Sequence, residues 1–128
     1  MSTHTAATRV ALAYFDAWTG HDMDKAMTYI APDIVCDAPY GRMEGADAYR
    51  AFVAPYSDIL RSAAMLAVFG DENTALVMYD TATETVPSAP SAELVTVENG
   101  LITKSRFIFD RLPFQDARAA RAAAAAPS

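Results

Sequence analysis

The chain has 128 residues, 52% of them hydrophobic, and carries a formal net charge of -6. This length and apolar content predict one small domain built around a single core. The acidic balance argues against nucleic acid or an anionic membrane surface as a partner, because both select for clustered Lys and Arg. A hydrophobic small molecule is the partner that the composition favours.

Residues suited to metal or covalent chemistry are few. Cys36 is the one cysteine, so no internal disulfide can form, and we interpret it as a small buried hydrophobe rather than a nucleophile. His4 and His21 are too few and too far apart to predict a metal site. The N-terminus lacks a basic start followed by an apolar stretch, and no apolar run is long enough to span a bilayer. We therefore expect a cytoplasmic protein that uses neither metal nor cofactor.

The N-terminal segment predicts a long helix. It begins near Thr3 or Thr5, because either hydroxyl can cap free backbone amides. It ends at Gly20, the residue best suited to a left-handed C-terminal cap. Tyr14 and Trp18 lie at helical spacing on its apolar stripe, which we expect to face inward.

A shorter helix, a strand and a third helix are predicted next. Asp22 can cap the second helix, and the residue before Pro32 ends it because that residue avoids helical geometry. Pro55 is expected to end the third helix. The predicted ranges are residues 23–30 for the second helix, 33–38 for the strand, 39–41 for a loop and 45–54 for the third helix.

Four strands are predicted in the second half of the chain. Their ranges are residues 59–69, 74–84, 92–97 and 101–109. The segments 70–73 and 98–100 have the composition of tight hairpin turns, so the sheet is expected to be mainly antiparallel. We expect residues 1–112 to form the domain and the Ala-rich residues 113–128 to be a frayed or disordered tail.

Strand alternation assigns side chains to the two faces of this sheet. Phe107 and Phe109 share a face on the last strand, which we interpret as the inner one, and Tyr79 is expected to point inward as well. Leu76 and Met78 fall on the outer face, where they suit a dimer patch.

Glu93 breaks the apolar pattern of its strand. It falls in register with Val95 and Val97, and a carboxyl group on an apolar face has a raised pKa because its charged form loses hydration. A protonated carboxylic acid can donate a hydrogen bond. The alternative is that residues 91–93 are the exposed, frayed start of the strand.

The order of elements from Tyr14 to Gly45, helix, turn, short helix, strand and loop, resembles one fold family. That family is the nuclear transport factor 2-like superfamily, in its SnoaL-like and ketosteroid-isomerase-like branch. The resemblance implies an α+β fold, a cone-shaped barrel in which N-terminal helices pack on a curved, mainly antiparallel sheet around an apolar pocket. It also implies a homodimer.

The resemblance also implies roles for particular residues. Tyr14 and Glu93 fall on the two groups that donate hydrogen bonds to the substrate oxygen in ketosteroid isomerases. Ala38 falls where those enzymes carry a catalytic base, and Asp37 lies one residue earlier, on the opposite face of the strand. A bulge would be needed to turn Asp37 inward.

Three functions therefore remain open. One is a cofactor-free acid/base enzyme, of isomerase or cyclase type, that acts on a hydrophobic carbonyl compound such as a steroid- or polyketide-like molecule through Tyr14, Glu93 and Asp37. Another is a non-catalytic protein that binds a ligand in the same pocket. A dimeric scaffold acting through the outer face is a third option. The predicted pocket residues are Trp18, Cys36, Ala38, Tyr40, Tyr56, Tyr79, Thr81, Ser105, Phe107 and Phe109.

Overall fold

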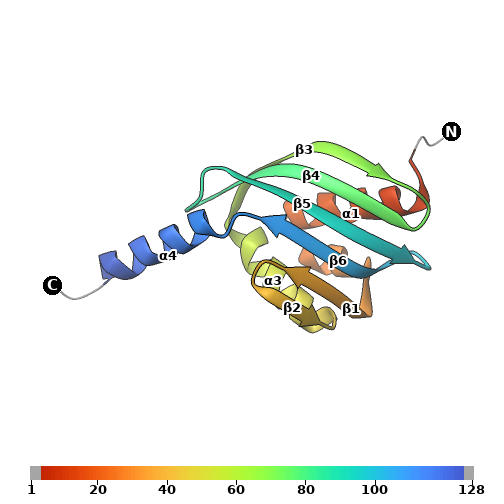
Figure 1. Cartoon of the computed structure of the whole chain (residues 1–128), viewed down its shortest axis with the longest axis horizontal. Coiled ribbons are helices and arrows are strands. Elements are labelled where there is room, and N and C mark those ends of the chain that lie inside the picture. Colours follow the sequence, from red (N-terminus) through yellow and green to blue (C-terminus); the bar gives the residue numbers. More distant parts are fainter. Residues whose placement is uncertain (1–3, 126–128) are drawn as a thin grey trace.

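The protein is an open, curved six-stranded sheet with helices packed on one face (Figure 1). The computed structural model describes residues 4–125. The strands are β1 (Ile30–Ala38), β2 (Gly41–Glu44), β3 (Leu60–Gly70), β4 (Thr74–Thr83), β5 (Ala89–Glu98) and β6 (Leu101–Phe109). The helices are α1 (Ala6–Thr19), α2 (Met23–Met27), α3 (Ala46–Ile59) and α4 (Leu112–Ala125).

The sheet has the order β2-β1-β6-β5-β4-β3, and all neighbours are antiparallel except the β1–β6 pair. The predicted α+β class and mainly antiparallel sheet are thus confirmed. The sheet curves without closing, since β2 and β3 remain as edges. Irregular register in β3, between Met65 and Ala67, is the kind of bulge that bends a strand.

The core lies between the concave face of the sheet and α1, α2 and α3. The predicted inward side chains are found there: Tyr14 is 2% exposed and Glu93 is also 2% exposed. Leu76 and Met78 are exposed on the other face, as alternation predicts. The interpretation of residues 91–93 as a frayed strand start is wrong, because β5 begins at Ala89 and Glu93 pairs with both neighbouring strands.

The ends of α1 differ in detail from the prediction. Thr5 is the N-cap residue, but its hydroxyl contacts the Thr8 hydroxyl at 2.9 Å and caps no backbone amide. Thr3, the other predicted start, lies outside the described residues. Gly20 has φ -86°, and the left-handed residue is His21, at φ 64°. Its Nδ1 lies 2.7 Å from the Ser57 carbonyl oxygen, a tertiary contact that sequence alone does not reveal.

The second helix is shorter than predicted and the first strand longer. Asp22 caps α2 as expected, accepting a hydrogen bond from the Lys25 amide at 3.1 Å. The chain then becomes extended at Ile30, because the Ile102 amide donates to the Tyr29 carbonyl at 2.7 Å and β1 joins β6 there. Pro32 sits in the irregular stretch of that pairing, where its missing amide breaks no ladder bond.

Two further elements depart from the predicted ranges. The predicted loop at residues 39–41 leads directly into β2, an edge strand paired with the end of β1. Helix α3 continues through Pro55 to Ile59. Its last turn is held by tertiary bonds that compensate for the amide missing at Pro55: the Ser57 hydroxyl donates to the Trp18 carbonyl at 2.7 Å, and His21 contacts the Ser57 carbonyl.

Residues 112–125 form α4, which projects away from the body of the domain (Figure 1). The sequence predicts a frayed or disordered tail over residues 113–128. Its first turn nevertheless contacts the domain, because the Phe114 ring lies 5.8 Å, between centroids, from the rings of both Tyr56 and Phe109. Residues 126–128 of the predicted tail lie outside the described part. No helix among the described residues is long and apolar enough to cross a membrane.

Candidate functional site

An aromatic cavity of about 240 Å³ opens between α3, the start of α4 and the inner face of the sheet. Eight of its thirteen lining residues are aromatic, and the lining is mostly apolar. The lining residues are Trp18, Tyr40, Phe52, Val53, Pro55, Tyr56, Ile59, Tyr79, Ser91, Phe107, Phe109, Phe114 and Arg118. Cavities of this kind, apolar with a few polar groups, are the usual form of a small-molecule site.

Ring contacts between separate elements hold the cavity wall in place. Trp18 of α1 packs against Tyr56 of α3 and Tyr79 of β4, with centroids 6.0 and 5.8 Å apart. Phe52 of α3 packs against Phe107 and Phe109 of β6. Each such pair contributes about 0.5–1.5 kcal/mol beyond the area it buries. The aromatic side chains of the wall therefore hold one another in place before a ligand binds.

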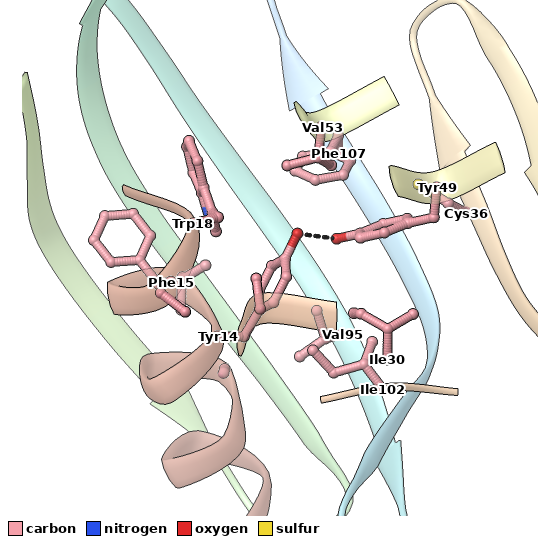
Figure 2. Packing of buried hydrophobic residues seen from close by; sticks show 14 of the residues in the cluster. Tyr14, Phe15, Trp18, Ile30, Cys36, Tyr49, Val53, Val95, Ile102 and Phe107 are labelled. Carbon is pink, nitrogen blue, oxygen red and sulfur yellow. Dashed lines mark hydrogen bonds between the residues drawn. The ribbon is translucent and has the colours of Figure 1, made fainter. Parts of the chain in front are cut away.

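A buried group of four polar side chains, called here the hydroxyl–carboxyl network, consists of Tyr14, Tyr49, Glu93 and Ser105. The Tyr49 hydroxyl lies 2.7 Å from the Tyr14 hydroxyl and 2.9 Å from Oε2 of Glu93, and the Ser105 hydroxyl donates to the same Oε2 at 2.5 Å. Figure 2 shows Tyr14 of α1 and Tyr49 of α3 pointing at one another. Because a hydroxyl carries one proton, Tyr49 donates to only one of its two partners at a time.

The environment of Glu93 raises its pKa to about 7. Burial is the largest cause, and the hydrogen bonds from Ser105 and Tyr49 offset part of it because they favour the charged form. Across β4 and β6 its neighbours are Val77 and Phe107, which supply no charge. Glu93 is thus divided between its acid and its carboxylate near neutral pH, as an acid/base group requires.

Burial also raises the pKa of the three inward tyrosines Tyr14, Tyr49 and Tyr79 well above the ordinary value, and the negative charge of Glu93 adds to the effect. These phenols stay protonated at neutral pH. They can donate hydrogen bonds but cannot act as bases there. Glu93 is consequently the member of the hydroxyl–carboxyl network that can exchange a proton near pH 7.

The hydroxyl–carboxyl network lies beneath the cavity and not in its wall. Tyr14, Tyr49 and Glu93 are nearly or fully buried, and none of them lines the cavity. Phe107 belongs to the cavity wall and stacks on Tyr49 of the tyrosine pair (Figure 2). The Tyr49 hydroxyl stands between Tyr14 and Glu93, where a substrate oxygen would have to accept hydrogen bonds from both.

Asp37 is placed on the surface of the sheet. Its carboxylate forms an ion pair with Arg42 at 2.8 Å, and its side chain is 40% exposed. The hydrogen bond from Arg42 is the main cause of its lowered pKa. β1 runs regularly from Val35 to Ala38, without the bulge that would turn Asp37 toward Glu93. The structure thus separates Asp37 from the hydroxyl–carboxyl network.

The predicted pocket residues fall into two groups. The structure places six of them in the cavity wall, namely Trp18, Tyr40, Tyr56, Tyr79, Phe107 and Phe109. The other four do not line it: Ser105 bonds Glu93, Thr81 bonds Tyr56 and the Ala89 carbonyl, Cys36 is fully buried, and Ala38 is partly buried against the core. Burial raises the pKa of Cys36 to about 12, so its thiol stays protonated.

Sequence reasoning missed several residues of the site. Tyr49 lies on the third helix, and its alignment with Tyr14 and Glu93 depends on packing between distant elements. Phe114 and Arg118 line the cavity, although they lie in the segment predicted to be a frayed or disordered tail. Their i, i+4 spacing, which places both on one helix face, was the one available signal.

Within residues 4–125 no three His, Cys, Asp or Glu side chains are grouped so as to hold a metal ion. The groups that the site offers are therefore aromatic surfaces, hydroxyl donors, one titrating carboxyl group and one guanidinium group.

Comparison with known proteins shows the family to which the chain is similar. Residues 11–105 match the family model described as a SnoaL-like domain. No curated protein matches the chain. A crystallised protein from Kribbella flavida DSM 17836 is 58% identical to the chain, covers 92% of it and 98% of its own length, and superposes with a TM-score of 0.89.

More distant structures share the fold alone. An NTF2-like protein of unknown function from Cytophaga hutchinsonii ATCC 33406 is 19% identical, covers 90% of this chain and 99% of its own, and has a TM-score of 0.74. A steroid delta-isomerase from Pseudomonas aeruginosa is 11% identical, covers 94% of both chains and also has a TM-score of 0.74. At these identities the similarity concerns the backbone and not the activity.

Proposed function

The chain belongs to the SnoaL-like domain family, and we propose that it binds a hydrophobic, cyclic small molecule in its aromatic cavity. The observation that carries this proposal is the preformed cavity of about 240 Å³ with eight aromatic residues in its wall. Planar rings present large apolar faces at little entropic cost, so a flat or cyclic ligand gains most from such a wall. Hydroxyls of Tyr40, Tyr56, Tyr79 and Ser91 come from lining residues and offer a few polar contacts.

A second candidate function is cofactor-free acid/base catalysis, of isomerase or cyclase type, on a carbonyl group of that ligand. The hydroxyl–carboxyl network favours it, because Glu93 has a pKa of about 7 and Tyr14 is a permanent hydrogen-bond donor. A carbonyl oxygen that displaced the Tyr49 hydroxyl would accept hydrogen bonds from both groups. Catalysis therefore requires either that the ligand reach past Phe107 or that α3 move. Binding in the cavity requires neither. The proposal gives Asp37 no role.

Isothermal titration calorimetry with a planar phenol, 2-naphthol, tests binding directly. We expect saturable binding by the wild-type protein and a loss of affinity in Phe109→Ala, which removes part of the cavity wall. Ile108→Ala is the matched control, because Ile108 neighbours Phe109 on the strand but is 63% exposed on the other face. Equal binding by wild type and Phe109→Ala would show that the cavity is not the ligand site.

The same titration separates the two candidate functions. Contact between the ligand and the hydroxyl–carboxyl network predicts weaker binding in Tyr14→Phe and Glu93→Gln, and turnover of cyclic enones that both substitutions lower. Binding confined to the cavity predicts unchanged affinity in both variants and no turnover. Circular dichroism checks that each variant is folded.

The homodimer and the cytoplasmic location also stay proposals. Large apolar side chains on the outer face of the sheet, such as Leu76, Met78 and Leu94, are 42–47% exposed and suit a partner surface. Sedimentation velocity tests the dimer: a monomer in both wild type and Met78→Glu would reject it, and a dimer that Met78→Glu dissociates would support it.

A further inference from the structure

Arg118 is the one charged residue among the thirteen that line the aromatic cavity. It lies on α4, one helical turn after Phe114, so the two side chains share a helix face. Phe114 packs on Tyr56 and Phe109 in the cavity wall, and this contact places Arg118 at the same cavity. Arg118 is exposed, which places it at the mouth rather than in the interior.

A second cation stands at the same mouth. The guanidinium carbon of Arg111 lies 4.6 Å from the centroid of the Tyr40 ring, and its Nη1 donates to the Pro39 carbonyl at 3.4 Å. Tyr40 lines the cavity and is 43% exposed, so its ring marks the rim. The cation–π contact fixes Arg111 without neutralising its charge.

The described residues supply no carboxylate partner for either arginine. The ion pairs found in residues 4–125 join Arg42 to Asp37 and Arg50 to Asp24. Asp110, which precedes Arg111 in the sequence, accepts a hydrogen bond from the Leu112 amide at 2.9 Å, and neither it nor Asp116 lines the cavity. Two cations therefore face the opening of an apolar cavity in a protein of net charge -6.

We infer that the ligand of this cavity is an amphipathic acid, with its ring system among the aromatic side chains and its carboxylate at the mouth on Arg118. This inference rests on the proposed binding function and specifies the class of ligand. A planar guanidinium group binds a carboxylate through two parallel hydrogen bonds, while the aliphatic stem of the arginine can lie along apolar surface. Arg111 adds to the local positive potential.

The net charge of -6 does not exclude an acidic ligand at this mouth. At physiological ionic strength charges are screened over about 8 Å, so an approaching carboxylate responds mainly to the groups at the mouth. The same screening predicts that the preference for an acid falls as salt is added. A neutral ligand of the same shape forms no ion pair with Arg118.

Calorimetric titration with two ligands of one shape tests the inference. 2-Naphthoate is ionised at neutral pH and 2-naphthamide is neutral. At low salt we expect the wild-type protein to bind the naphthoate about fivefold more tightly, the size of an exposed ion pair. Arg118→Gln should abolish that preference while leaving the affinity for the amide unchanged. Arg121→Gln is the matched control, because Arg121 is an exposed arginine on the same helix that does not line the cavity.

Each outcome of this titration decides a separate point. Equal affinity of the wild type for the two ligands overturns the inference and leaves the proposed binding function standing. Equal losses in Arg118→Gln and Arg121→Gln overturn the assignment to Arg118, because general charge would then explain the preference. Naphthoate binding that Phe109→Ala does not weaken places the acid elsewhere and also overturns it. No binding of either ligand rejects the proposed function together with the inference.

Discussion

The aromatic cavity and the hydroxyl–carboxyl network lie next to each other but differ in solvent exposure and in polarity. The cavity is lined mainly by rings, opens to solvent and has Arg118 at its mouth. The network is closed to solvent, and each of its four side chains has a hydrogen-bond partner inside the protein. Apolar surface can stay open at modest cost, whereas buried polar groups must be satisfied internally. Binding capacity and acid/base capacity are therefore held in separate layers.

Phe107 joins the two layers, because it lines the cavity and also stacks on Tyr49 with centroids 6.2 Å apart. We expect Phe107→Ala to lower the free energy of unfolding by about 3–5 kcal/mol, since a buried Phe leaves a large void. Urea denaturation measures the change. The neighbouring Ile108→Ala should cost about 0.5 kcal/mol or less, because that side chain is 63% exposed. Similar costs for the two substitutions would contradict the assigned burial.

The pH dependence of the free energy of unfolding tests the protonation of Glu93 in the hydroxyl–carboxyl network. Glu93 has a pKa of about 7 when folded and an ordinary value of 4.5, so between these pH values the folded protein holds a proton that the unfolded chain has lost. The contribution of Glu93 to stability is therefore fully present below about pH 4.5 and is lost as the pH rises to about 7. This loss lowers the free energy of unfolding by about 3 kcal/mol.

The measurement compares wild type with Glu93→Gln by urea denaturation from pH 4.5 to 8. The other carboxyl groups titrate alike in both proteins, so the difference between the two curves reports Glu93. We expect this difference to change across the window and to become constant above about pH 7.5. A constant difference throughout would mean that Glu93 is ionised in the folded protein as it is in the unfolded chain.

Tyr49→Phe tests whether the Tyr49 hydroxyl links the two sides of the network. Its removal takes one partner from the buried Tyr14 hydroxyl and one from Glu93, so we expect a loss of about 1–3 kcal/mol in the free energy of unfolding. Affinity for 2-naphthol should be unchanged if binding is confined to the cavity. Tyr29→Phe, at a partly exposed position, is the control and should lie within about 0.5 kcal/mol of wild type.

Phe114→Ala addresses the rim of the cavity and has the smallest expected effect on stability. Phe114 is half-buried and contacts Tyr56 and Phe109, so we expect a change of at most about 1 kcal/mol in unfolding together with weaker 2-naphthol binding. Leu112→Ala, 58% exposed on the same helix, should leave both quantities unchanged. Unchanged ligand affinity in Phe114→Ala would remove α4 from the binding site.

Local patterns predicted much of the fold. The range 101–109 matches β6, and the start of β4 at Thr74 was also correct. Period-two alternation put Tyr79 and Glu93 on the inner face and Met78 on the outer face, because a strand with one buried face must alternate. The end of α3 could not be predicted in this way, since its last turn depends on Ser57 contacting Trp18.

The candidate site was likewise predictable only in part from local sequence patterns. Alternation predicted a carboxyl group in an apolar setting at Glu93, and spacing predicted inward aromatics such as Trp18 and Phe107. Tyr49 and Ser105 acquire their contacts with Glu93 only when α3 and β6 pack against β5. The same packing decides that Glu93 lies beneath the cavity rather than in its wall.

By itself, the sequence determined an acidic chain with helices ahead of a mainly antiparallel sheet. It also determined which side chains share a face, because hydrophobic periodicity and turn residues act over a few neighbouring positions. Only the tertiary structure decided which distant groups meet. It placed Tyr49 between Tyr14 and Glu93, paired Asp37 with Arg42 on the surface, and brought Phe114 and Arg118 to the cavity. Contacts between residues far apart in the chain depend on how whole elements pack, which no local pattern encodes.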